Sequence, residues 1–281
     1  MTSIKNLPAQ LFEQYNSFRK EIPSILKAQN FADNLINFLF PFKADKKCTL
    51  PLIELNFSQL QLDFKDLINP LEKILEDDPN KLTKKFFDKI QGIYESLMKD
   101  AKLFLDFDPA ARSMESVILY YPGFYCISIY RLANVLYNLK IPYLPRMMSE
   151  YAHSKTGIDI HPGATIGDHF FIDHGTGIVI GETTIIGRNV KIYQGVTLGA
   201  AYVKKSMKGI KRHPTIEDNV VIYSGTSILG GDTVVGHDSI VGGNVWLTKS
   251  VPPFSIVYHE SKVTIRDSKK FKENEPINFI I

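Results

Sequence analysis

Residues 159–198 read DIHPGATIGDHFFIDHGTGIVIGETTIIGRNVKIYQGVTL, and this stretch decides the fold because its branched apolar residues recur every six positions. A helix would space such residues three and four apart, and an ordinary strand would alternate them with polar residues. A period of six is typical of a solenoid in which six residues form one flat side and three sides close one coil. The branched residue of each side then points inward, which predicts a left-handed parallel β-helix.

The six-residue period continues beyond this stretch. It shifts by two residues between Ile178 and Ile180, and it disappears through residues 200–213. The interval from Leu198 to Ile216 equals three sixes, so the later series is expected to keep the register of the second one. A period sustained over this length disfavours the alternative of an irregular all-β domain. The predicted inward positions, all apolar, are Ile160, Ile166, Ile172, Ile178, Ile180, Ile186, Ile192, Leu198, Ile216, Ile222, Ile228, Val234, Ile240 and Trp246.

The composition changes abruptly near residue 155. Of the 18 glycines, all but Gly92 and Gly123 lie between Gly157 and Gly243, where they suit solenoid corners that need positive φ. The expected fold class is therefore α+β. It comprises an all-helical domain over residues 1–155, a left-handed parallel β-helix (hexapeptide solenoid) over 156–258 with a loop at 200–213, and a C-terminal tail over 259–281.

The N-terminal part is predicted to be helical from its own spacing of apolar residues. Residues 85–104 and 124–139 place apolar side chains three and four apart with charged residues between them, the pattern of amphipathic helices. Asp108 followed by Pro109 predicts a helix start, with the aspartate as N-cap and the proline in the first turn.

Composition also limits the class of protein. The 281 residues are 44% hydrophobic and 22% charged, no apolar run approaches the ~20 residues of a membrane span, and residues 1–20 lack an export signal. Cys48 and Cys126 lack metal or redox spacing, which favours a reducing compartment, so we expect a cytoplasmic protein without a membrane partner. The net charge of +3 comes from nearly balanced totals and argues against a nucleic-acid-binding protein.

The interruption at residues 200–213 reads AAYVKKSMKGIKRH and contains five Lys or Arg residues and no acidic ones. It is either a solvated surface loop or a segment that brings positive charge to an anionic ligand. Arg212 and His213 are the stronger candidates for a function because they lie where the chain rejoins the rigid solenoid.

Polar residues concentrate between Gly157 and Thr183. An imidazole beside a carboxylate suits general base chemistry near neutral pH, because the carboxylate orients the ring and stabilises the imidazolium. The spacing of Asp159 and His174 does not match one 18-residue coil, so the two meet either within one chain or across a subunit contact. Three histidines also raise the alternative of a zinc site with an open fourth position. The polar residues are Asp159, His161, Asp168, His169, Asp173, His174 and Glu182.

Several short motifs together resemble one enzyme family. The chain resembles the serine O-acetyltransferases of bacterial cysteine biosynthesis, which are hexapeptide-repeat acyltransferases. The resemblance covers residues 105–255 and matches the layout of a preceding helical domain. The motifs are DPA at 108–110, DIHPGATIG at 159–167, IDHGTGIVIGET at 172–183, QGVTLG at 194–199, KRHPTI at 211–216 and SVPP at 250–253.

The resemblance implies a role for each matching polar residue. His174 is the expected general base, which removes the proton from the L-serine hydroxyl as it attacks acetyl-CoA, and Asp159 is expected to orient the imidazole. Asp108 and Asp173 match the carboxylates that hold the substrate amino group. The substrate carboxylate is expected to bind Arg212 and His213, since a guanidinium can donate two parallel hydrogen bonds to it.

The family uses acetyl-CoA as its co-substrate, and no metal is expected. Two departures concern the CoA contacts: Ala200, Ala201 and Tyr202 replace a common Gly-Thr-Gly, and the Gly-Pro-Ala segment typical beyond Pro253 is missing. The residues expected to line the CoA groove are Gly199, Ala200, Ser224, Gly225, Gly242 and Gly243.

The resemblance also implies partners. We expect a homotrimer with each site between two chains, a possible dimer of trimers through the helical half, and L-cysteine as feedback inhibitor. The terminal Ile281 resembles a docking peptide for O-acetylserine sulfhydrylase (cysteine synthase), although the tail could instead fold onto its own solenoid. The alternative functions are an acetyltransferase acting on another hydroxyl or amine acceptor, a metal hydratase on the same solenoid, and a non-catalytic regulatory subunit.

Overall fold

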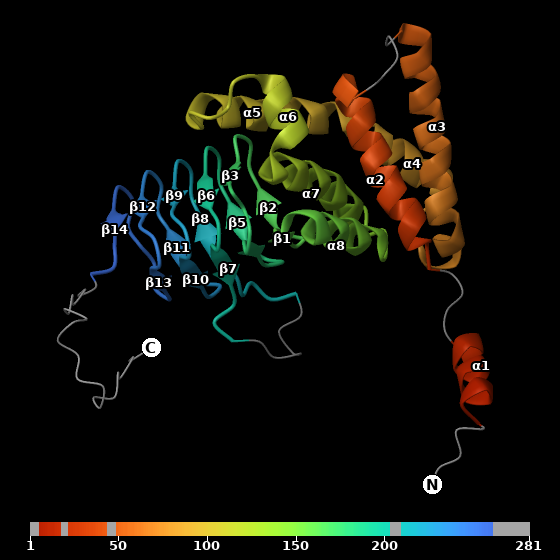
Figure 1. The fold of residues 1–281 in the computed structure, drawn as a ribbon. Coiled ribbons are helices and arrows are strands. Elements are labelled where there is room, and N and C mark those ends of the chain that lie inside the picture. The colour runs from red at the N-terminus through yellow and green to blue at the C-terminus, as the bar shows by residue number, and fades with distance from the viewer. Residues whose placement is uncertain (1–5, 18–21, 44–48, 203–208, 261–281) are drawn as a thin grey trace, which may run out of the picture.

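The computed structural model describes residues 6–17, 22–43, 49–202 and 209–260. A helical N-terminal region leads into a three-sided solenoid of parallel strands, as Figure 1 shows. This arrangement confirms the expected helical region followed by a hexapeptide solenoid. Cys48 and all but the first two residues of the predicted tail lie outside the described residues. Within the described part of the chain, no helix combines the length and apolar character needed to cross a membrane.

Aromatic side chains form part of the buried core of the N-terminal helical region. The rings of Phe64 and Phe86 stack with centroids 4.7 Å apart, and Phe31 lies 5.5 Å from Phe64. The described α-helices are α1 (Leu7–Ser17), α2 (Ile25–Leu39), α3 (Leu50–Ile68), α4 (Pro79–Phe87), α5 (Ile90–Phe107), α6 (Met114–Tyr120), α7 (Pro122–Asn138) and α8 (Leu144–Thr156).

The predicted helix start at Asp108 is wrong. Asp108 follows the last residue of α5 and begins a turn, in which its Oδ1 accepts a hydrogen bond from the Ala110 N–H at 2.8 Å. The next helix, α6, begins later because Ser113 and Ser116 form a reciprocal capping box there. Aspartate satisfies a nearby N–H in a turn as readily as at a helix start, so the Asp-Pro pair alone does not distinguish the two.

Three parallel sheets form the sides of the solenoid. Sheet A has the order β1-β4-β7-β10-β13, sheet B the order β11-β8-β5-β2, and sheet C the order β14-β12-β9-β6-β3. The strands are β1 (Asp159–Ile160), β2 (Thr165–Ile166), β3 (Phe171–Asp173), β4 (Val179–Ile180), β5 (Ile185–Ile186), β6 (Lys191–Tyr193), β7 (Thr197–Gly199), β8 (Thr215–Ile216), β9 (Val221–Ile222), β10 (Ser227–Leu229), β11 (Val234–Val235), β12 (Ile240–Val241), β13 (Trp246–Leu247) and β14 (Ile256–Val257).

The predicted inward positions are buried from Ile160 to Ile228, and Leu198 aligns with Ile228 across the interruption as expected. The last three predictions are wrong, because the inward position moves on by one residue after Ile228. Val235 is buried and pairs with Ile216, whereas Trp246 is 69% exposed. The corner after β10 contains one extra residue, accommodated by Gly230 at φ 106°.

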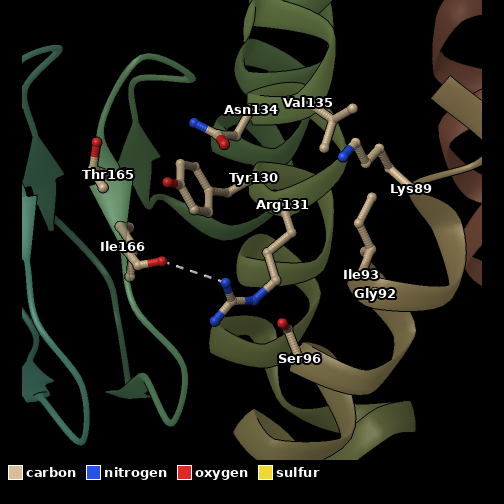
Figure 2. A pocket seen from close by; sticks show the side chains of 10 residues that line it. All are labelled: Lys89, Gly92, Ile93, Ser96, Tyr130, Arg131, Asn134, Val135, Thr165 and Ile166. Carbon is tan, nitrogen blue, oxygen red and sulfur yellow. Dashed lines mark hydrogen bonds between the residues drawn. The ribbon is translucent and has the colours of Figure 1, made fainter. Parts of the chain in front are cut away.

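A buried ion pair joins the helical region to the solenoid. The Arg131 Nε of α7 lies 2.6 Å from Asp100 Oδ2 of α5, and both side chains are at most 9% exposed. Arg131 also donates to the carbonyl oxygens of Ile166 and Gly167, and Figure 2 shows the guanidinium reaching strand β2. The Phe170 N–H donates to Asp100 Oδ1 at 2.9 Å. The pair thus ties two helices to the first coil.

The contact continues where α7 begins against β3. A Cβ on Gly123 would lie 2.5 Å from the Ile172 carbonyl oxygen, so only glycine permits this approach. Phe171 of β3 packs against Phe104 and Phe107 of α5, with ring centroids 4.6 and 5.3 Å away. These contacts place the end of α5 beside the end of β3.

Candidate active site

The polar residues predicted between Gly157 and Thr183 are spread over three corners of the solenoid. We name each corner by the two sheets that it joins. His161 follows β1 at the A–B corner, His169 lies between β2 and β3 at the B–C corner, and His174 follows β3 at the C–A corner. One chain therefore does not bring the three imidazoles together, and the alternative of a three-histidine zinc site is wrong for a single chain.

The C–A corner of the first coil presents His174 to the outside. This corner is two residues longer than the next one along the solenoid, because Ile172 and Ile180 are eight positions apart where Ile192 and Leu198 are six. The His174 backbone has φ 56°, and its side chain is 72% exposed. Its Nε2 lies 3.7 Å from Asp173 Oδ1, so the imidazole is within ion-pair distance of the residue before it.

Asp108 joins Asp173 at this corner. The Tyr121 hydroxyl donates a hydrogen bond of 2.6 Å to Asp108 Oδ2. Burial raises the pKa of Tyr121 to about 12, and the negative charges of Asp108 and Asp173 contribute to the shift. Phe107 packs against Phe171 and Gly123 packs against Ile172, so the helical region places Asp108 near the strand that ends in Asp173, although the two aspartates lie far apart in the sequence.

Two further tyrosines border the carboxylates, and our sequence analysis missed them. Tyr193 stacks on Tyr223 with centroids 5.0 Å apart. Burial raises the pKa of Tyr193, with smaller contributions from Tyr223, Asp173 and Asp108. Tyr193 pairs with Asp173 in sheet C. Asp173, Tyr193 and Tyr223 each come directly after an inward-facing isoleucine of that sheet. The six-residue register could therefore have placed both tyrosines beside Asp173.

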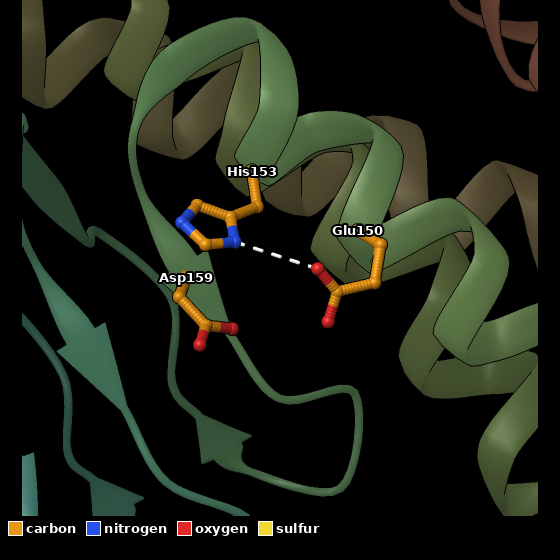
Figure 3. A group of neighbouring side chains, drawn as sticks. All are labelled: Glu150, His153 and Asp159. Atoms are coloured by element: carbon orange, nitrogen blue, oxygen red, sulfur yellow. Dashed lines mark hydrogen bonds and ion pairs between the residues drawn. The ribbon is translucent and has the colours of Figure 1, made fainter.

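Asp159 begins β1 and lies against helix α8. Figure 3 shows its carboxylate facing Glu150 and His153, and ligand atoms of the three residues lie within 4.8 Å of one another. These three are the only described residues grouped closely enough to hold a metal ion, but Arg146 already forms an ion pair with Glu150. Among the described residues, no hydrogen bond or ion pair joins Asp159 to His174, so their pairing stays a prediction.

Arg212 lies at the A–B corner. Its guanidinium forms an ion pair with Glu182 in which both side chains are at most 25% exposed. Glu182 also accepts a hydrogen bond of 2.9 Å from the Tyr137 hydroxyl, and the two donors lower its pKa although burial opposes them. This corner therefore holds a fixed, well-partnered arginine.

His213 packs beside Arg212 in a fixed protonation state. Its Nδ1 accepts a hydrogen bond of 3.0 Å from the Thr183 N–H, and burial together with Arg212 and Lys211 lowers its pKa to about 4. A neutral ring that accepts at Nδ1 carries its proton on Nε2. A Cβ on Gly181 would lie 2.1 Å from the His213 ring, so glycine is required beneath it. The A–B corner thus presents a neutral N–H donor.

Known proteins resemble the chain in sequence. It is 49% identical over 189 residues to a plasmid-encoded serine acetyltransferase of Synechococcus elongatus. The matched segment covers 66% of this chain and 59% of that protein. It is 44% identical over 182 residues to the serine acetyltransferase of Bacillus subtilis, which covers 64% of this chain and 82% of that protein. The chain belongs to the serine acetyltransferase family. No family model matches it.

Solved structures of the family share the fold of this protein. Serine acetyltransferase 1 of Entamoeba histolytica in complex with L-cysteine superposes with a TM-score of 0.74 at 36% identity, covering 89% of this chain and 96% of that one. The Neisseria gonorrhoeae enzyme in complex with serine gives a TM-score of 0.58 at 26% identity, covering 82% and 95%. The family resemblance inferred from the motifs is confirmed.

The predicted acceptor-binding residues fall into two half-sites on different corners of the solenoid. Asp173 and His174 at the C–A corner, with Asp108 from the end of α5, are the acidic half-site, and Arg212 with the neutral His213 at the A–B corner is the second half-site. Sheet A lies between the two corners. The structure therefore does not assemble all predicted acceptor-binding residues at one place within a single chain.

The residues predicted to contact CoA divide between the same two corners. Gly199 ends β7, and Ala200 follows it at the A–B corner. The others follow β9 and β12 at the C–A corner, where Gly225 has φ 72° and a Cβ would lie 2.3 Å from the Asn244 side chain. The C–A group consists of Ser224, Gly225, Gly242 and Gly243.

Proposed function

We propose that this enzyme transfers the acetyl group of acetyl-CoA to the hydroxyl of L-serine, giving O-acetyl-L-serine and CoA in the first step of cysteine biosynthesis. The observation that carries the proposal is the exposed imidazole of His174, 3.7 Å from the Asp173 carboxylate, at the end of the strand against which α5 packs just before Asp108. Carboxylates attract an ammonium group, and the imidazole of the residue that follows Asp173 can reach a hydroxyl on the same small molecule. Relatives named serine acetyltransferase and neighbour structures with serine and CoA support this assignment.

In the proposed reaction His174 acts as general base. The imidazole takes the proton from the serine hydroxyl while the hydroxyl oxygen attacks the thioester carbonyl. The C–S bond then breaks, and the departing sulfur takes the proton back from the imidazolium. Asp173, 3.7 Å from His174, stabilises the imidazolium electrostatically, and Asp159 has the role of orienting the ring. The proposed mechanism uses no metal ion.

The two charged groups of the acceptor, its ammonium and its carboxylate, bind to two different chains. Asp108 and Asp173 of one chain hold the ammonium group, and Arg212 and His213 of a neighbour receive the carboxylate. The division of these groups between corners supports a homotrimer, because each C–A corner then meets the next chain's A–B corner. L-cysteine carries the same ammonium and carboxylate, so we expect it to inhibit by competing with serine.

The same contact between chains provides the groove for acetyl-CoA. The small C–A residues from Ser224 to Gly243 and the partner's A–B residues Gly199 and Ala200 would contact the pantetheine chain through backbone groups. Pairing of trimers through the helical region and docking of Ile281 on O-acetylserine sulfhydrylase are further parts of the proposal. Ile281 lies outside the described residues.

One assay tests the proposed function. Thiol release from acetyl-CoA is measured with serine, homoserine, threonine and a galactoside as acceptors. We expect serine to give the highest kcat/KM, because its short side chain places the hydroxyl near His174 while both charged groups remain bound. A galactoside that outcompetes serine would instead support an acetyltransferase for another hydroxyl acceptor.

A further inference from the structure

Tyr121 fixes the orientation of one carboxylate in the acidic half-site. Its hydroxyl donates to Asp108 Oδ2 at 2.6 Å, and the Ala110 N–H donates to Asp108 Oδ1 at 2.8 Å. Both oxygens of Asp108 are therefore held, each with capacity for a further hydrogen bond. The phenol is the only side chain among these donors and can be altered without changing the backbone.

The backbone around Tyr121 is itself well constrained. Tyr121 lies between α6 and α7, with φ −84° and ψ 115°, and the following Pro122 favours this extended conformation. Its N–H donates to the Val117 carbonyl, and its carbonyl accepts from the Tyr125 N–H. The ring lies edge-on to Phe104, 5.7 Å away between centroids. The hydroxyl consequently has a defined position beside Asp108.

A hydroxyl at this position opposes the electrostatic repulsion between two carboxylates. Asp108 and Asp173 repel each other when both are ionised, which favours rotation of Asp108 away from Asp173. The phenol is a donor at neutral pH, since its ordinary pKa of about 10 lies well above 7 and burial raises it further to about 12. A short hydrogen bond to a carboxylate is of the stronger, charge-assisted kind and opposes that rotation.

We infer that Tyr121 is a positioning residue of the acceptor site, whose hydroxyl fixes the Asp108 carboxylate in the orientation in which it binds the ammonium group of the acceptor. This inference rests on the proposed function. It extends that function by naming a side chain outside the family motifs that determines affinity for amino-acid acceptors.

The test compares Tyr121→Phe with the wild type and with Tyr120→Phe. Tyr120 is the adjacent tyrosine and is 76% exposed, so it provides a matched control. We expect Tyr121→Phe to raise the KM for serine about tenfold, the loss of one charge-assisted hydrogen bond, with kcat and the KM for acetyl-CoA within about twofold of wild type. The inhibition constant of cysteine should rise by the same factor as the KM for serine.

A second acceptor separates positioning from general structural support. 3-Hydroxypropanoate has the hydroxyl and carboxylate of serine but no ammonium group, so Tyr121→Phe should leave its kcat/KM unchanged. An equal loss with both acceptors, or a Phe variant that fails to fold, would show a structural role and overturn the inference. Wild-type enzyme without serine turnover would overturn the proposed function itself. An active wild type with an unchanged serine KM in Tyr121→Phe would overturn the inference alone.

Discussion

The Tyr121 hydroxyl donates a hydrogen bond of 2.6 Å to Asp108 at the end of helix α5, and Phe107 beside Asp108 packs against Phe171 of strand β3, which ends at Asp173. The contact depends on the junction between the helical region and the solenoid, where Asp100 and Arg131 form a buried ion pair. The helical region therefore contributes half of the acidic site. Substitutions in this junction should alter the position of Asp108 and lower the stability of the protein.

Replacing His174 with alanine should remove most of the activity. The loss of a general base lowers kcat by roughly 10² to 10⁴, while the fold persists because the side chain is mostly exposed. His169→Ala is the matched control, since His169 also has positive φ but lies at another corner. Steady-state kinetics and circular dichroism check both variants. A His174→Ala variant with more than about half of wild-type turnover would exclude His174 as the base.

Replacing Asp159 with asparagine should be less damaging. The base remains, and only the orientation of its ring is lost, so we expect a smaller fall in kcat than for His174→Ala. Kinetics of the two single variants and the double variant check this. Additive effects in the double variant would show that Asp159 acts independently of His174.

Breaking the Asp100–Arg131 pair should destabilise the protein strongly. Arg131→Met leaves the buried Asp100 carboxylate without its partner, which costs about 3–5 kcal/mol of unfolding free energy. Lys84→Met breaks the exposed pair with Asp88 and should cost less than about 1 kcal/mol. Urea denaturation measures both. Similar losses for the two variants would contradict a special contribution from burial.

His213 should make stability depend on pH. Its folded pKa of about 4 lies below the ordinary 6.5, so between these values the unfolded chain binds more protons than the folded one. The unfolding free energy should therefore rise from pH 4 to pH 6.5, by at most roughly 1.4 kcal/mol per pH unit from this group, and level off above. His213→Gln should flatten this part of the curve in denaturation experiments at several pH values. An unchanged slope would show that His213 is not buried in its neutral form.

The solenoid was predictable because its period is local in the sequence. Ile160 to Ile228 could be placed inward from spacing alone, and the positions of Asp173 and His174 on one corner follow from that register. The shift after Ile228 was not predictable, because an extra residue at Gly230 leaves a second plausible series through Trp246. Only the tertiary structure shows which series faces the core.

The features of the site that could not be predicted depend on contacts between segments that lie far apart in the sequence. Asp100, Arg131 and Tyr121 carry no motif, and their roles arise from how α5 and α7 pack on the first coil. Asp159 was expected beside His174, but in the single chain it faces Glu150 and His153. Its placement depends on the packing of α8 and, under our proposal, on a neighbouring chain.

Mixing two inactive variants tests whether each active site needs two chains. Asp173→Asn with His174→Ala disables the C–A corner and leaves the A–B corner intact, whereas Arg212→Ala does the reverse. Under the proposed trimer, a C–A corner from the second variant meets an A–B corner from the first in mixed assemblies, which should restore about one quarter of the sites in an equal mixture. Each variant alone should stay nearly inactive.

The control for this experiment pairs two variants with defects at the same corner. Mixing His174→Ala chains with Asp173→Asn chains should restore nothing beyond their separate activities, because neither chain supplies an intact C–A corner. Co-expression with two affinity tags isolates the mixed trimers, and light scattering checks their mass. No recovery in either mixture, or an active wild-type monomer, would mean that one chain completes the site by itself. Recovery only in the first mixture would support the division of the acceptor's ammonium and carboxylate between neighbouring chains.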